Sequence, residues 1–109
     1  MLNSGGNFGM RYLEGMGVFD ANGLGLFPYD DRMLCYIMAL YNSCVAKTYL
    51  SILSSTMAFV IGDMKRIPIR YDEEIQCAFT PIVENNIEIA QREWNSFEVS
   101  WDFDKHPLI

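Results

Sequence analysis

The sequence predicts an α+β fold in which short antiparallel strands pack on a helical pair and a kinked C-terminal helix follows. Three observations lead to this fold class. A long apolar run with helical spacing occupies residues 30–55, short apolar stretches alternate with glycine-rich turn signals, and a second helical pattern begins after Asp72 and contains Pro81. With 109 residues, half of them apolar and a fifth charged, the chain can form one small domain or part of a larger one.

The residues before position 30 are predicted to form a meander of short strands. The glycine-containing opening suggests a flexible entry loop, at a start that is either cut from a longer chain or natural. The candidate strands after it are Met10–Leu13, Gly17–Phe19 and Leu24–Phe27. Asn22-Gly23 tolerates positive φ and supplies a turn. Five glycines between positions 9 and 25 weaken each strand, so we expect the meander to lean on the helical pair.

The helical pair follows from two apolar units with helical spacing. The first consists of Leu34, Ile37, Met38 and Tyr41, and the second of Val45, Tyr49, Ile52 and Leu53. Asn42-Ser43 disfavours a helix interior, and the Ser43 hydroxyl can cap a new helix. Asp30 and Asp31 suit the first helix because its dipole favours negative charge at the N-terminus. The sequence therefore predicts two helices with a break at Asn42-Ser43, or one long kinked helix.

The segment after the helical pair is predicted to contain a strand and an extended edge piece. Met57–Ile61 is a compact apolar run, which Gly62-Asp63 would turn, with Asp63 capping a single helical turn. Ile67–Ile69 is expected to be extended, and Pro68 confines it to a sheet edge or a strand end.

The last third is predicted to be helical with a break at a proline. Asp72 is a suitable N-cap, and Pro81 should end or kink the helix near Phe79-Thr80 and start a second segment that runs to Phe97. Beyond it, apolar and polar residues alternate, which indicates a strand or an arm laid across a neighbouring surface. The apolar members of this alternation are Val99, Trp101 and Phe103.

The net charge of −6 is unevenly distributed. Residues 1–71 hold six basic and five acidic residues, whereas residues 72–109 hold two basic and nine acidic residues. We therefore divide the chain into an α+β unit, 1–71, and an acidic connecting helix with an apolar arm, 72–109. A phosphate backbone repels the second part, so a nucleic-acid surface is expected only in the first.

No catalytic, cofactor-binding or metal-ligating residue is predicted. His106 is the only histidine, which excludes a histidine-based acid–base pair or a two-histidine metal site within this chain. Cys35, Cys44 and Cys77 form no CxxC pair and are expected to be buried, reduced thiols, as suits the cytoplasm. No apolar run is long enough to span a bilayer.

Basic side chains are the candidates for ligand contact. Lys65, Arg66 and Arg70 surround the extended piece, with further candidates at Arg11 and Lys47. Such residues can meet DNA phosphates, and the alternative is ordinary solvated charge.

Two stretches carry a resemblance to a known family. The first resembles the end of the target-recognition domain in adenine-specific DNA methyltransferases and restriction–modification specificity proteins. It consists of Phe19–Pro28, Ala39–Ser43 and Ser55–Ile69. The stretch from Trp94 to Leu108, with its ordered tryptophans, is similar to PglX-like methyltransferases of BREX phage-defence systems. The resemblance covers nearly the whole chain and implies a fragment from the C-terminal part of the target-recognition region.

In that family, catalysis belongs to a separate Rossmann-like domain, which binds S-adenosylmethionine and holds the flipped adenine with an Asn-Pro-Pro-Tyr motif. The present sequence contains no such motif, so no catalytic residue is carried over. The resemblance implies that the fragment helps the parent protein to recognise double-stranded DNA and contacts other domains of the parent chain. The alternative is a protein-docking or scaffold module that does not touch DNA and whose apolar arm allows the isolated fragment to self-associate.

Overall fold

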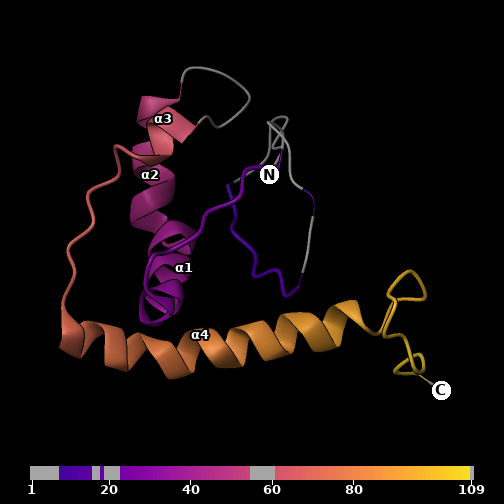
Figure 1. Cartoon of the computed structure of the whole chain (residues 1–109). Coiled ribbons are helices and arrows are strands. Elements are labelled where there is room, and N and C mark those ends of the chain that lie inside the picture. Colours follow the sequence, from indigo (N-terminus) through magenta and orange to yellow (C-terminus); the bar gives the residue numbers. More distant parts are fainter. Residues whose placement is uncertain (1–7, 16–17, 19–22, 55–60, 109) are drawn as a thin grey trace.

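The described part of the chain, residues 8–15, 18, 23–54 and 61–108 of a computed structural model, is helical and contains no strand. Its elements are the 3₁₀ turn η1 (Asp31–Met33) and the helices α1 (Leu34–Asn42), α2 (Cys44–Leu53), α3 (Ile61–Met64) and α4 (Glu73–Trp94). In Figure 1, α1, α2 and α3 follow one another as a stack, and α4 runs across the end of the stack beside α1. Among these described helices, none combines the length and apolar character that a bilayer crossing requires.

The predicted break between the two central helices is confirmed, and Ser43 forms both sides of it. Its backbone N–H donates to Leu40 O at 3.1 Å and closes α1, while its Oγ accepts from Ala46 N at 3.2 Å and caps α2. Ser43 itself is extended, with ψ of 157°. The Ser43 hydroxyl therefore accepts from one of the backbone N–H groups that lose their partner where α2 begins.

The core lies where the stack meets the segment before it. Its buried members are Phe8, Ile37, Tyr41, Ala46, Leu50, Met64 and Ile67. Tyr41 connects three parts of the chain, because its ring packs on Phe8 with centroids 6.2 Å apart and its hydroxyl donates to Met64 O at 3.0 Å. Of the two predicted apolar faces, the first supplies Ile37 and Tyr41 to the core. The second supplies none of its members, because the buried residues of α2 are Ala46 and Leu50.

The α+β prediction is wrong for the described residues, because the N-terminal segment (residues 8–15) pairs with a side chain instead of a strand. The amide of Asn42 accepts from Met10 N at 2.9 Å and donates to Met10 O at 3.0 Å. This pair of bonds replaces two rungs of a β-ladder, and the glycine-rich sequence supplies no partner strand. Met10–Leu13, Leu24–Phe27 and Ile67–Ile69 are all irregular.

The predicted strands that include residues 16–17, 19–22 or 57–60 fall wholly or partly outside the described residues. Ile61, assigned to the end of one of them, instead begins α3. Asp63 lies inside that short helix, so its predicted role as a cap is also wrong.

Helix α4 starts where predicted but does not end at Pro81. Asp72 caps it by accepting from Glu74 N at 3.0 Å, and the helix continues to Trp94 (Figure 1). Pro81 has no backbone N–H, so the carbonyl of Cys77, four residues earlier, loses its helical hydrogen bond. Both residues are exposed, so water can bond to this carbonyl instead. The packing of α4 on α1 holds residues on both sides of the proline in one helix.

The C-terminal tail is a series of turns and not a strand. Ser100 is buried, its Oγ donates to Asn95 Oδ1 at 2.7 Å, and it accepts from Asp102 N at 3.2 Å. Trp101 is fully exposed beside it. Of the two predicted alternatives, the strand is therefore excluded.

The cysteines are free, as expected, but they are not uniformly buried. Cys35 is half-buried against α4, whereas Cys44 and Cys77 are exposed. Cys44 belongs to the predicted apolar run but lies on an outer side of α2, and Cys77 lies on an exposed side of α4.

Candidate functional site

Helix α4 organises the candidate site because it presents three different faces. At 100° per residue, Gln76, Thr80, Val83 and Ile87 form one stripe, and these are the buried or half-buried residues of the helix. The Gln76 amide donates to Arg32 O and fixes this stripe against η1, the turn that leads into α1. The other two faces are free to contact something else.

The second face is apolar and exposed. We call it the apolar stripe and define it as Ile75, Phe79, Ile82 and Ile89, whose exposed fractions are 38%, 41%, 56% and 51%. The third face carries carboxylates and borders a cleft.

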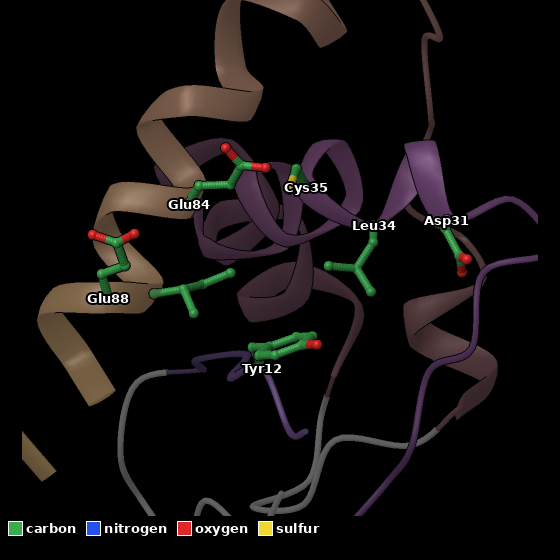
Figure 2. A pocket seen from close by; sticks show the side chains of 7 residues that line it. Tyr12, Asp31, Leu34, Cys35, Glu84 and Glu88 are labelled. Atoms are coloured by element: carbon green, nitrogen blue, oxygen red, sulfur yellow. The ribbon is translucent and has the colours of Figure 1, made fainter. Parts of the chain in front are cut away.

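The cleft has a volume of about 570 Å³ and lies between α4, the start of α1 and the N-terminal segment (Figure 2). Its lining residues are Tyr12, Asp31, Leu34, Cys35, Glu84, Ile87 and Glu88. In Figure 2, Glu84 points toward Cys35, Glu88 lies along the same helix, and Tyr12 lies across the cleft from them. Three carboxylates thus surround a partly apolar floor.

The electrostatics of the cleft favour cations and repel phosphates. Burial, and secondarily the charge of Glu84, raises the pKa of the Cys35 thiol above its usual range. The thiol therefore remains protonated at neutral pH, which disfavours nucleophilic chemistry. His106 lies in the tail, where its Nδ1 accepts from Leu108 N at 3.2 Å. Within the described ranges, no group of three or more potential metal ligands converges.

A second, smaller hollow lies on the outer face of α2. It has a volume of about 220 Å³ and is lined by Val45, Thr48, Tyr49 and Ile52. Val45 and Tyr49 were predicted to face the core, but both are exposed because the residue that follows each of them, Ala46 and Leu50, turns inward instead.

The structure groups three of the five basic residues predicted for DNA contact. Lys65, Arg66 and Arg70 lie on the connection between α3 and α4, and all three are exposed. Lys47 is on α2, and Arg11 is on the N-terminal segment, which lies on the other side of the helical stack in Figure 1. In the part of the chain that the structure describes, none of the five forms an ion pair, whereas Arg32 pairs with Asp30 at 2.7 Å.

The connection that carries the three cations is anchored at several points. Ile67 is buried, with 4% of its surface exposed, and Arg66 N donates to Asp63 O at 3.1 Å. Farther along, the Tyr36 hydroxyl donates to the backbone carbonyl of Arg70. The cationic side chains therefore extend outward from an anchored backbone.

The acidic cleft was not predicted from the sequence. The sequence favours Asp31 as a helix N-terminal residue over a metal-binding carboxylate, and the acidity of the last third gives no indication that Glu84 and Glu88 face Tyr12. The available signal was their spacing of four residues, which places both on one side of a helix.

Comparisons with known proteins identify what the chain is similar to. It is 33% identical over 106 residues to the adenine-specific methyltransferase PglX of Lacticaseibacillus casei (strain Zhang), a match that covers 97% of this chain and 9% of that protein. It is 32% identical over 104 residues to the adenine-specific methyltransferase BrxX of Escherichia coli O9:H4 (strain HS), covering 94% of this chain and 8% of that protein. No protein-family model and no solved structure matches.

The chain therefore spans less than a tenth of the length of these relatives, and it fits a fragment of such a protein. The resemblance found in the sequence is confirmed at this level.

Proposed function

We propose that this chain is a non-catalytic segment of an adenine-specific DNA methyltransferase of a phage-defence system and contributes to DNA target recognition through backbone contacts. The parent protein would act in the cytoplasm on double-stranded DNA and use S-adenosylmethionine. Methyl transfer would take place outside this segment, since the sequence has no Asn-Pro-Pro-Tyr motif. The described residues likewise offer no cluster suited to that cofactor.

The observation that supports a DNA contact is the set of three unpaired cations on the α3–α4 connection. Lys65, Arg66 and Arg70 occur within six residues, and all are exposed on an anchored backbone. The nearby carboxylate of Asp72 accepts hydrogen bonds from the first turn of α4 and, among the described residues, forms no ion pair with any of the three. Phosphate contacts of this kind position a protein on a duplex and strengthen its binding without reading the bases.

The acidic third face of α4 supports a DNA contact at the α3–α4 connection. Glu84 and Glu88 repel a phosphate backbone, so DNA would approach from the side of the α3–α4 connection. Lys47 and Arg11 lie on other elements, and any DNA contact they make would belong to a separate part of the surface.

The test is the salt dependence of DNA binding by the full-length methyltransferase. The slope of log K against log salt is negative. The variant Lys65→Ala/Arg66→Ala/Arg70→Ala should make it less steep by about 2 to 3, because each lost phosphate contact removes about 0.9 from its magnitude. The matched control is Arg92→Ala/Lys105→Ala, which removes cations from the acidic third and should leave the slope unchanged. An unchanged slope in the triple variant would contradict the proposal.

A second candidate function, a docking or scaffold module without DNA contact, is favoured by one observation in the tail. Trp101 and Val99 are among the most exposed apolar residues, although Ser100 between them is buried and anchored to Asn95. Light scattering would compare the chain with a version that ends at Phe97. A lower mass for the shortened chain supports an associating arm, and the same monomer mass for both excludes it.

A further inference from the structure

The apolar stripe of α4 repeats every seven residues. Ile75, Phe79, Ile82 and Ile89 are separated by four, three and seven positions, and Asn86 occupies the remaining position of the repeat. This is the spacing of the contact positions in paired helices. The same helix already uses a different stripe, at 76, 80, 83 and 87, to pack on α1.

The flanks of the stripe are suited to a close helical neighbour. One bordering residue on each side, Ala78 and Ala90, is small, exposed and uncharged. From Ile75 to Ile89 the stripe is about 21 Å long at 1.5 Å per residue. An apolar row of this length, with an alanine on each side of it, can pack against another α-helix.

Two polar residues within the repeat specify the partner's chemistry. Asn86 requires a polar partner, since a buried amide without a hydrogen bond is costly, and such a residue fixes the register of paired helices. Glu93 continues the repeat four residues after Ile89 and would attract a lysine or arginine.

A second copy of this chain is a poor occupant. Two copies, each with a net charge of −6, repel one another, and a parallel pair would place Glu93 opposite Glu93. By contrast, more than nine-tenths of the length of the similar methyltransferases lies outside the matched segment. A helix from that remainder is tethered to α4 and is therefore present at high effective concentration.

We propose that the apolar stripe of α4 binds an amphipathic helix from another part of the same methyltransferase chain. That helix has apolar residues with alternating three- and four-residue spacing, a polar residue opposite Asn86 and a basic residue opposite Glu93. This inference rests on the proposed function, because it requires a longer parent chain.

The test is site-specific photocrosslinking in the full-length methyltransferase. p-Benzoylphenylalanine is incorporated in place of Phe79, on the stripe, and in a matched control in place of Gln91, which is exposed on another side of α4. We expect a crosslink from position 79 to a distant segment of the same chain with the stated pattern, and none to that segment from position 91. Ile82→Asp should abolish the crosslink, and Gln91→Asp should not.

Each other outcome overturns the inference. A crosslinked product of twice the chain mass identifies a second copy, and a crosslink to a different protein identifies an external partner. Absence of any crosslink at position 79 shows that the stripe is uncovered. Thermal unfolding of each labelled protein confirms that the label is tolerated, and the salt slope of DNA binding, measured on the same preparations, tests the proposed function independently.

Discussion

Replacing Asn42 should release the N-terminal segment from the helical stack. The Asn42 side chain holds Met10 at both its N–H, at 2.9 Å, and its carbonyl, at 3.0 Å. It also donates to Met38 O at 3.0 Å, which orients the amide. We expect Asn42→Ala to leave both backbone groups of Met10 without this partner and to increase local opening of the segment.

The magnitude follows from two solvent-exposed hydrogen bonds. Each contributes roughly 0.5–1.5 kcal/mol net, so their loss should destabilise the closed segment by about 1–3 kcal/mol. This corresponds to about a 5- to 160-fold increase in the opening equilibrium. Asn42→Asp should be at least as disruptive, because it keeps the acceptor for Met10 N but places a carboxylate beside two carbonyl oxygens.

The assay is amide hydrogen exchange of Met10, measured by NMR in the 109-residue chain. Exchange in the Asn42→Ala variant should accelerate by the factor above, whereas α2 amides should change little because the opening is local. The control Asn85→Ala alters an exposed asparagine on α4 and should leave Met10 unchanged. Equal Met10 protection in the wild type and in Asn42→Ala would refute the assignment of the side-chain clamp.

Three further predictions concern the core, a helix cap and a thiol. Leu50→Ala should lower the free energy of unfolding by about 2–5 kcal/mol, because Leu50 is fully buried and truncation leaves a cavity, as chemical denaturation would show. Ser43→Ala should cost about 1 kcal/mol in the same assay, since α2 loses its N-cap bond, whereas Ser43→Asp should retain most of that stability. At pH 8, Cys35 should react with iodoacetamide more slowly than the exposed Cys44, because burial raises its pKa. Since folding favours the protonated Cys35 thiol, its contribution to stability is complete below the usual thiol pKa and is lost as the pH rises through the folded-state value.

Each of these predictions has a control. Ile52→Ala, at a position with 76% of its surface exposed, should cost far less than Leu50→Ala, and equal losses would contradict the assigned packing. A Ser43→Asp variant as unstable as Ser43→Ala would show that the hydroxyl acts elsewhere than at the cap. Equal alkylation rates of Cys35 and Cys44 in the folded chain would contradict the burial of Cys35, and in denaturant the two rates should converge.

Local signals in the sequence were reliable where one side chain meets its own backbone. Asp72 begins α4, and Ser43 separates α1 from α2, because a cap needs only a hydrogen-bonding side chain and amides two or three residues ahead. The strands predicted within the described residues did not form, because strand pairing depends on a distant partner. Asn42 supplied that partner as a side chain, and the sequence identified it only as a helix breaker.

The candidate site was predicted in part. The cations at 65, 66 and 70 are neighbours in sequence, so their grouping needed no tertiary information. The acidic cleft brings Tyr12, Asp31 and Glu88 together from three separate elements, and no local pattern indicates such a meeting. Pro81 shows a related effect, since packing on α1 favours one continuous helix over the local preference for a break.

The sequence by itself determined the helical pair, the caps at Ser43 and Asp72, the division of charge and the similarity to adenine-specific methyltransferases. These properties depend on residue type and short-range spacing, which can be determined without knowledge of the fold. Only the tertiary structure decided which apolar faces are covered. Ala46 and Leu50 are buried while Val45, Ile52 and the apolar stripe of α4 remain exposed, because burial depends on which surfaces meet and a periodic pattern states only that a face exists.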